Sequence, residues 1–357
     1  MAHRAVLLLA VLAVGAAAAG CGKPSAPAPV SVGLVTSTDG LGDRSFNDAA
    51  YAGLEACSKQ LGTQLSVEQP KSAADYEPRL TVLATRNTGE VFALGYAMNR
   101  AVSNVARRFE KRHFVIIDAV VDLPNVESIT FKEQDGSFLA GALAALVSKT
   151  KTVAFIGGVD VPLTRKSEAG FTAGVREIDP KIHVAVDYAG SFDDAAAGSR
   201  AATTLFARGA DVIYTVAGRT GLGAIAVAKA RPGRYVIGVD SNQDALAPGT
   251  VLASVVKRVD IAAQRACADA VAQKPISGHV VLGVADQGVA LTDFHFTRRV
   301  VGAANLAYLD RLTSAIAGGA IVPPATRAEV ASFKPVRVAG IPAARVTTVT
   351  VRHVPRT

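Results

Sequence analysis

The feature that most constrains the fold is a regular alternation of short apolar runs with amphipathic segments, beginning at Val30. Apolar, β-branched runs separated by helical segments are typical of parallel strands in a sheet that helices cover on both faces. The sequence predicts strands at Val30–Val35, Leu65–Glu68, Val91–Leu94, Phe114–Ile117, Val126–Phe131, Val153–Ile156, Val184–Tyr188, Val212–Val216, Val236–Val239, Val251–Val255 and Val280–Leu282. It predicts helices at Ser45–Leu61, Asp75–Arg86, Met98–Phe109, Asp135–Ser148, Ser167–Ile178, Asp193–Arg208, Gly221–Ala230 and Asp260–Ala272.

The alternation runs, stops near Ser148 and restarts at Val153. Such a repeated series predicts an α/β protein of two doubly wound parallel-sheet lobes. We expect an N-terminal lobe at 30–149, a C-terminal lobe at 150–256 and crossover elements that complete both lobes at 257–322. Residues 323–357 form an additional C-terminal tail of unknown role, in which Val346–Val351 alternates Thr and Val as an added strand would.

The N-terminus has the layout of a lipoprotein signal peptide at 1–20. Arg4 precedes an uncharged apolar run from Ala5 to about Ala19, which is too short to span a bilayer comfortably. The run ends at Ala18-Ala19-Gly20-Cys21, which resembles a bacterial lipobox and predicts lipidation of Cys21; ordinary cleavage leaving a free thiol is the alternative. Residues 21–29 are rich in Pro and Ala and predict a tether. We therefore expect an exported protein held at the cell envelope, in a leaflet that the sequence leaves open.

Composition narrows the classes of function. Half of the residues are hydrophobic, which indicates a packed globular body. The net charge of +8 comes from scattered Lys and Arg, so a solvated basic surface is favoured over nucleic-acid binding. The six His are dispersed, and the chain lacks CxxC and HExxH motifs, so we expect no metal and no cofactor. Export permits a disulfide between Cys57 and Cys267, but two buried free thiols fit the sequence equally well.

Polar residues and glycines follow the predicted strands at the positions where ligands bind in sheets of this kind. They occur at 36–48 after the first strand, at Asp118, at 217–223, at 240–243 and at Lys257. Because ligands sit outside the carboxyl ends of parallel strands, we expect these residues from both halves to line a cleft between the lobes.

Several of these stretches carry a resemblance to a known family. They are Gly40-Leu41-Gly42-Asp43-Arg44-Ser45-Phe46-Asn47-Asp48, Gly157-Gly158-Val159-Asp160-Val161-Pro162, Gly190-Ser191-Phe192-Asp193-Asp194, Ala217-Gly218-Arg219-Thr220-Gly221, Gly238-Val239-Asp240-Ser241 and Ser254-Val255-Val256-Lys257-Arg258-Val259-Asp260. In this order, from about Val30 to Leu312, the chain resembles the basic membrane protein family of ABC-transporter substrate-binding lipoproteins. The resemblance implies a type I periplasmic-binding-protein fold, an ABC permease as partner and, in one branch, a purine nucleoside as ligand.

The resemblance also implies roles for residues that would contact the base. Phe46 would stack on it, Asn47 would read its edge, and Asp118 would accept hydrogen bonds from its nitrogens. Tyr214 is a candidate second stacking face. Each residue also has a structural interpretation: a core side chain for Phe46 and Tyr214, a helix cap for Asn47, and a turn after a strand for Asp118.

Asp240, Lys257 and Gly218 would serve the rest of the ligand. Asp240 would accept the ribose hydroxyls, Lys257 would lie near the ribose or pair with Asp240, and Gly218 would let the backbone approach. A surface lysine is the alternative for Lys257. The chain departs from the family at Arg219, where a second glycine is usual, and at Ser167, where an aromatic residue is frequent. Both departures leave the identity of the ligand open.

Two other classes of function fit parts of the sequence. A nucleoside hydrolase would need clustered carboxylates, but Asp39, Asp43 and Asp48 are spaced apart and no nucleophile elbow is present, so we do not expect an enzyme. A sensor that presents its closed form to a receptor, or a protein that binds a different solute such as a sugar, would share the export signal and the cleft. The expected function is solute capture for an ABC importer by hinge closure, with sensing as the alternative.

Overall fold

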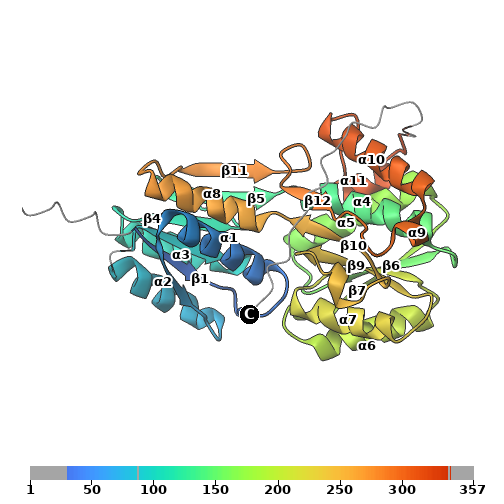
Figure 1. The fold of residues 1–357 in the computed structure, drawn as a ribbon, viewed down its shortest axis with the longest axis horizontal. Helices are drawn as coiled ribbons and strands as arrows, with labels where there is room; N and C mark the ends of the chain where they lie inside the picture. Colours follow the sequence, from blue (N-terminus) through green and yellow to red (C-terminus); the bar gives the residue numbers. More distant parts are fainter. Residues whose placement is uncertain (1–29, 87, 337, 339–357) are drawn as a thin grey trace, which may run out of the picture.

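The computed structural model describes residues 30–86, 88–336 and 338. They form two α/β lobes side by side, each built on a six-stranded sheet (Figure 1). The two-lobed α/β fold predicted from the sequence is confirmed. Cys21, the signal segment 1–20, the tether and Val346–Val351 lie outside the described residues. Within the described part of the chain, no helix is long and apolar enough to cross a membrane.

The N-terminal lobe has a wholly parallel sheet with strand order β11-β5-β4-β3-β1-β2. Its strands are β1 (Ser31–Val35), β2 (Gln64–Glu68), β3 (Glu90–Leu94), β4 (His113–Ile117), β5 (Val126–Phe131) and β11 (Gly278–Leu282). Its helices are α1 (Phe46–Leu61), α2 (Tyr76–Thr85), α3 (Asn99–Arg108) and α8 (Val259–Val271). Alternate strand residues face opposite ways, so Phe92 packs in the core under α1 and α8, whereas Val91 packs under α2 and α3.

The C-terminal lobe has the strand order β12-β10-β9-β8-β6-β7, in which only the pairing of β12 with β10 is antiparallel among the described strands. Its strands are β6 (Thr152–Gly157), β7 (His183–Tyr188), β8 (Val212–Val216), β9 (Tyr235–Asp240), β10 (Val251–Lys257) and β12 (Val289–Leu291). Helices α4 (Glu133–Val147) and α5 (Pro162–Ile178) pack on one face, and α6 (Ala195–Ala207) and α7 (Arg219–Lys229) on the other. Three further helices follow: α9 (Arg298–Val301), α10 (Ala303–Ala317) and α11 (Arg327–Ser332).

Helix α4 lies in the C-terminal lobe, which differs from the lobe boundary expected at 149. The helix packs tightly along α5, where a Cβ at Gly174 would come within 1.9 Å of the carbonyl oxygen of Phe138. The chain therefore leaves the N-terminal lobe at Lys132, directly after β5. A single residue joins strand and helix there, so no Pro- or Gly-rich linker marks the crossing in the sequence.

The chain crosses between the lobes twice more, after β10 and between β11 and β12. The crossing after β10 carries α8 back onto α1, where a Cβ at Gly53 would lie 2.0 Å from the carbonyl oxygen of Asp260. A disulfide joins Cys57 of α1 to Cys267 of α8, with their Cα atoms 6.4 Å apart. This settles the question that the sequence left open in favour of the disulfide, which closes the crossover onto the N-terminal lobe.

The described part of the C-terminal tail packs on the C-terminal lobe. Arg327 of α11 makes a bidentate ion pair with Glu168 of α5, with nitrogen to oxygen distances of 2.9 and 2.6 Å. The ring of Phe333 packs edge-on against Phe138 of α4, with centroids 5.7 Å apart. Strand β12 and helices α9 to α11 were not predicted from the sequence.

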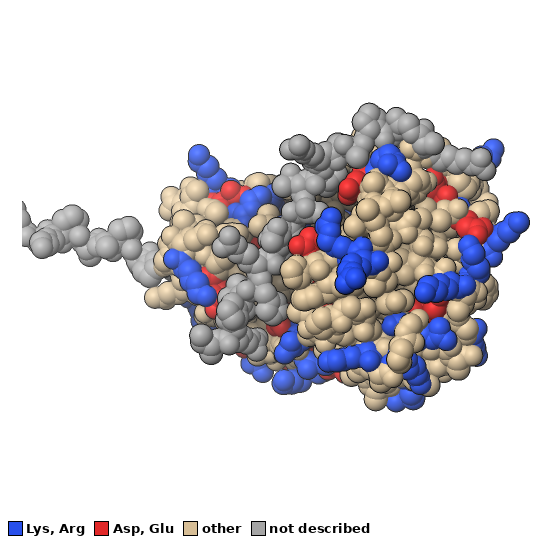
Figure 2. Space-filling model, turned by 45° about the vertical axis from the view of Figure 1, so that its right-hand side comes forward, with Lys and Arg blue, Asp and Glu red and all other residues tan. Residues whose placement is uncertain are grey.

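Lys and Arg side chains are spread over both lobes on the face shown in Figure 2, with acidic side chains between them. The observed surface on this face agrees with the scattered positive charge of the sequence.

Candidate functional site

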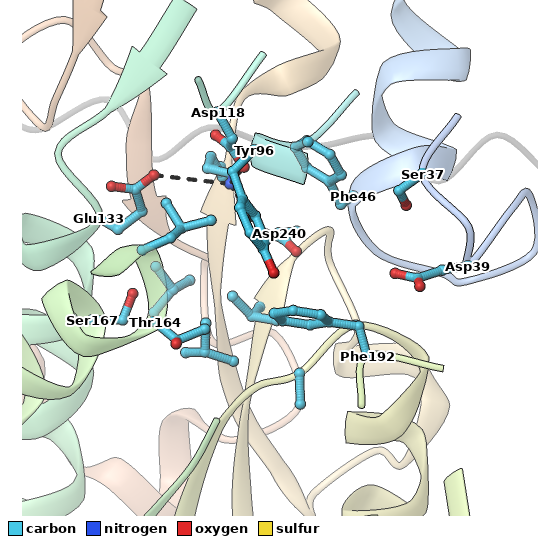
Figure 3. Close-up of a pocket in the computed structure, with 18 of the residues that line it drawn as sticks. Ser37, Asp39, Phe46, Tyr96, Asp118, Glu133, Thr164, Ser167, Phe192 and Asp240 are labelled. Carbon is cyan, nitrogen blue, oxygen red and sulfur yellow. Dashed lines mark hydrogen bonds and ion pairs between the residues drawn. The ribbon is translucent and has the colours of Figure 1, made fainter. Parts of the chain in front are cut away.

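A cavity lies between the lobes, where the carboxyl ends of the strands of both sheets meet (Figure 3). Both lobes contribute to its wall, as the sequence predicts. The lining residues are Ser37, Asp39, Phe46, Gly95, Tyr96, Asp118, Glu133, Leu163, Thr164, Ser167, Phe192, Tyr214, Val216, Ala217, Gly218, Val239, Asp240, Val255, Lys257 and Val289. The wall combines aromatic rings, aliphatic side chains and a small number of charged groups, which is typical of a small-molecule site.

Two phenylalanine rings line the cavity from opposite lobes. Phe46 is the first residue of α1, and Phe192 lies in the loop between β7 and α6 (Figure 3). Gly158 makes room for the second ring, because a Cβ there would lie 2.4 Å from the Phe192 ring. Phe192 was not among the residues predicted to bind, although it stands in one of the family motifs directly after a strand.

Tyr214 was predicted as a candidate second stacking face, but most of its surface belongs to the core. Its side chain is buried, and its ring packs against Phe155 and Phe171 with centroids 5.8 and 5.5 Å away. Its hydroxyl group lies 3.2 Å from the Ser137 hydroxyl. Tyr214 also lines the cavity, so it forms part of the wall while Phe192 supplies the more accessible ring.

Lys257, at the end of β10, is the centre of a buried ionic cluster. Its ammonium nitrogen lies 2.6 Å from Asp118, 3.8 Å from Asp240 and 4.0 Å from Glu133, and 4.7 Å from the centre of the Phe46 ring. Burial alone would lower the pKa of Lys257, but the three carboxylates outweigh burial and raise it. The ammonium therefore stays charged at neutral pH. Four of the predicted site residues meet here, namely Lys257, Asp118, Asp240 and Phe46, and Glu133 joins them without having been predicted.

The carboxylates of this cluster have unused hydrogen-bonding capacity. Asp118 Oδ1 and Glu133 Oε1 are buried and accept no hydrogen bond from the described residues. Burial raises the pKa of both Glu133 and Asp240, while Lys257 lowers it. Together with Lys166, which pairs with Glu133 at 2.5 Å, two ammonium groups face three carboxylates. The cavity is thus rich in acceptors for a ligand that carries several N–H or O–H donors.

Asp118 and Asp240 also share an unusual backbone conformation. Their φ angles are 68° and 63°, in the left-handed region that residues other than glycine seldom adopt. Each is placed where a strand ends, Asp118 just after β4 and Asp240 as the last residue of β9. Backbone strain of this kind concentrates at binding and catalytic sites, where it aims a side chain into the cavity.

Asn47 lies behind the wall of the cavity and is not one of its lining residues. Its side-chain oxygen accepts from the backbone N–H of Ser37 at 3.0 Å, and its amide nitrogen donates to the Ser37 hydroxyl at 2.8 Å and to Asp43 at 3.0 Å. Asn47 therefore holds the loop after β1, and Ser37 takes its place at the cavity surface. Gly218 lines the cavity with φ 53°, a left-handed conformation that favours glycine, and its lack of a side chain lets the backbone approach a ligand.

The lobes touch directly across the cleft. Asp43 caps the start of α1 by accepting from the backbone N–H groups of Asn47 and Asp48, at 2.8 and 3.1 Å. The Ser45 hydroxyl is therefore not used as a cap, and it donates instead to Asp240 Oδ2 of the other lobe at 2.8 Å. The Ser241 hydroxyl donates back to the Ser45 carbonyl oxygen at 2.8 Å. These contacts enclose the cavity on the side of α1.

Ser167 and Arg219, the two departures from the family, have different positions. Ser167 is buried and lines the cavity, where its small side chain leaves room that an aromatic residue would fill. Arg219 is not a lining residue and lies at the rim between the lobes. Across the described residues, no group of three or more His, Cys, Asp or Glu side chains is arranged to hold a metal ion.

Comparisons with known proteins identify the family to which the chain is related. The family model described as "ABC transporter substrate-binding protein PnrA-like" matches residues 30–311. The chain is 35% identical to the CD4+ T-cell-stimulating antigen of Listeria monocytogenes over 290 residues, which cover 73% of this chain and 81% of that protein. It is 36% identical to the ABC transporter nucleoside-binding protein BmpA of Lactococcus lactis over 225 residues, which cover 60% and 64% of the two chains.

A similar solved structure is that of an ABC transporter solute-binding protein from Aeropyrum pernix. It superposes with a TM-score of 0.78 at 26% sequence identity, covering 85% of this chain and 96% of that one. A glucose-galactose binding protein from Geobacillus stearothermophilus has the same fold, with a TM-score of 0.58 at 18% identity over 73% and 96% of the chains. The type I periplasmic-binding-protein fold expected from the sequence is thereby confirmed.

Proposed function

Because the chain belongs to the PnrA-like family of ABC transporter substrate-binding proteins, we propose that it captures a purine nucleoside between its lobes and delivers it to an ABC permease. The observation that carries this proposal is the pair of aromatic rings, Phe46 and Phe192, that line the cavity from opposite lobes beside an acceptor-rich ionic cluster. A planar base with N–H donors on its edge and a sugar with hydroxyl donors fit that combination.

The base would stack between the two rings and place its edge against Asp118 and Glu133. Base–aromatic stacking contributes roughly 1–3 kcal/mol per base and requires only a flat π surface. Asp118 Oδ1 and Glu133 Oε1 are buried acceptors without a hydrogen-bond partner among the described residues, so N–H groups of a ligand would satisfy them. The relative named as nucleoside-binding, at 36% identity, supports the same assignment.

The sugar would lie against Asp240 and Lys257. A carboxylate can accept hydrogen bonds from two hydroxyl groups, and an ammonium can donate to a ring or hydroxyl oxygen. Together the pair can bind both the donors and the acceptors of a polyol. The Ser45 hydroxyl already reaches Asp240 from the other lobe, so a sugar bound there would join both lobes. We propose binding without a chemical step.

Capture would proceed by hinge closure. A ligand that contacts both lobes favours the closed state in proportion to its preference for that state. Lipidation of Cys21 and the tether 21–29 would keep the protein near the permease at the cell envelope.

Calorimetric titration tests the ligand assignment. Guanosine, inosine and adenosine should each release or absorb heat with the delipidated protein, whereas the free base and ribose alone should bind far more weakly. Asp240→Asn should weaken nucleoside binding at least tenfold while the protein stays folded by circular dichroism. Saturable binding of a hexose or pentose, with no heat from any nucleoside, would replace the nucleoside with a sugar and leave the fold untouched.

A further inference from the structure

A polar contact joins the lobes at the rim of the cavity. Arg219 is the first residue of α7 in the C-terminal lobe, and its guanidinium donates to the backbone carbonyl oxygens of Asp39 at 2.9 Å and Leu41 at 3.5 Å in the N-terminal lobe. The same guanidinium pairs with Asp193 of its own lobe at 2.6 Å. Arg219 is therefore a charged group whose partner across the cleft is the main chain.

The acceptors of this contact are fixed by the N-terminal lobe itself. The Gly40 N–H donates to the Ser37 carbonyl at 3.1 Å, and the Leu41 N–H donates to the Gln69 side chain at 3.0 Å. Gly40 has φ 66°, which turns the loop sharply at this point. Because these bonds lie within one lobe, the carbonyl groups keep their direction whether or not Arg219 is present.

The donor is held just as firmly on the other side. The Thr220 N–H donates to the Phe192 carbonyl at 3.0 Å, and the Thr220 hydroxyl donates to the Ser191 carbonyl at 2.9 Å. The start of α7 and the loop that carries Phe192 are thus one unit. When Arg219 reaches the opposite loop, the aromatic wall of the C-terminal lobe is placed over the cavity.

We propose that Arg219 is a positioning residue that latches the closed state, contacting the N-terminal lobe only when the lobes are together. It raises ligand affinity by stabilising closure rather than by touching the ligand. The inference rests on the hinge closure in the proposed function but not on the identity of the ligand.

Closure also changes the electrostatic surroundings of a second group, the carboxyl group of Asp39. Burial, and then the negative charges of Asp193 and Asp43, raise the pKa of Asp39 to about 6, while Arg219 and a hydrogen bond from Ser37 oppose the rise. The phenol of Tyr96 faces Asp39 from the same lobe. Opening would hydrate Asp39 and separate it from Asp193, which returns its pKa toward the ordinary value near 4. The closed state therefore takes up a proton, and closure strengthens as pH falls from 7.5 through 6.

Single-molecule FRET on ligand-free protein tests the latch. Dyes on Glu110→Cys and Arg208→Cys, exposed positions in the N- and C-terminal lobes, report the distance between the lobes. Arg219→Ala should lower the ratio of closed to open molecules by roughly threefold to tenfold, as expected for a partly exposed charged hydrogen bond. Arg200→Ala is the matched control, because Arg200 forms a more exposed ion pair with Asp194 of its own lobe and makes no hydrogen bond or ion pair with the other lobe among the described residues.

The pH dependence separates a latch from a general structural effect. The closed fraction of the wild-type protein should rise from pH 7.5 to pH 5.5. Asp39→Asn should have a high closed fraction at both values, because the amide imitates the protonated carboxyl and leaves the backbone acceptor in place. An unchanged closed fraction in Arg219→Ala at both pH values would overturn the proposal. Because these measurements need no ligand, failure of nucleoside binding in the calorimetric test would leave them interpretable.

Discussion

Lys257 is the residue on which the charge balance of the site depends. Asp118, Asp240 and Glu133 surround its ammonium group, and all four side chains are largely buried. Removing one partner from a buried ionic cluster leaves uncompensated charge, which costs more than the cluster itself contributes. Lys257 therefore has a structural role beside the proposed binding role, and the two can be separated by experiment.

Lys257→Met should lower the free energy of unfolding by about 3–5 kcal/mol at pH 7.5, the usual cost of breaking a buried pair. Urea unfolding measures the loss. Lys59→Met is the control, because Lys59 forms an exposed pair with Glu55 and should change stability by less than about 1 kcal/mol. Equal effects of the two substitutions would contradict the central role of Lys257.

The loss should also depend on pH. Burial raises the pKa of Asp240 and Glu133, and Lys257 opposes that rise. Without Lys257 the folded-state pKa values move further above those of the unfolded chain. Stability from such groups is fully present below the unfolded pKa, near 4, and is lost as pH rises through the folded pKa. The deficit of Lys257→Met should therefore be smaller at pH 5 than at pH 7.5, whereas a purely steric defect would not change with pH.

Phe192→Ala tests the second aromatic wall. Loss of stacking should weaken nucleoside binding by about 1–3 kcal/mol, or about fivefold to 150-fold in Kd, measured by calorimetry. Phe296→Ala is the control, since Phe296 is exposed and is not among the residues lining the cavity. Unaltered affinity in Phe192→Ala would remove this ring from the proposed site.

The sequence predicts that the residues following the strands gather at one cavity, but it does not tell which of their side chains line it. Asp118, Asp240 and Lys257 follow from the rule that parallel strands end at one edge, and the structure brings all three together. Phe192 and Glu133 also come soon after strands, β7 and β5, but local sequence does not tell which side chain of the following loop or helix start faces the cavity. Asn47 is the opposite case. It was predicted to contact the ligand, but its side chain hydrogen-bonds to Ser37 and holds the loop after β1.

Among the helices of the N-terminal lobe, α8 is the one whose position depends most on contacts between residues far apart in the sequence. It reaches the N-terminal lobe by a crossover from the other lobe, and the disulfide from Cys57 to Cys267 fixes it against α1. The strands and helices predicted for both lobes correspond to elements of the structure, because the spacing of apolar residues reflects which side chains are buried. Local sequence does not tell to which lobe an element belongs. Helix α4, for example, belongs to the C-terminal lobe because it packs against α5.

The double substitution Cys57→Ser/Cys267→Ser should lower the free energy of unfolding by about 2–4 kcal/mol, because the disulfide closes a long loop in the unfolded chain. Urea unfolding of this variant, and of wild type with a reductant, should give the same midpoint. Ligand affinity should remain within about twofold, because neither cysteine lines the cavity. A large loss of affinity would instead make α8 part of the binding apparatus.

For the whole molecule, the question is what keeps the lobes together. The contacts across the cleft include Ser45 with Asp240, Ser241 with Ser45, and Lys257 with Asp118. A typical protein hydrogen bond contributes only about 0.5–1.5 kcal/mol net, and joining two lobes costs conformational freedom. In the proposed hinge closure, the closed state would therefore have only a small free-energy advantage or none, and a ligand that touches both lobes would decide the balance.

Small-angle X-ray scattering should detect this balance directly. The radius of gyration of ligand-free protein should exceed the value calculated from the closed structure and should fall to that value at saturating nucleoside. Asp240→Asn should reach the same final value only at a higher nucleoside concentration, because the Asn side-chain oxygen can still accept the hydrogen bond from Ser45 across the cleft while the ligand loses a charged acceptor. If calorimetry shows binding while the scattering stays constant, the lobes are already closed without ligand. The free energy of binding would then come from the cavity alone, and hinge closure would have no part in capture.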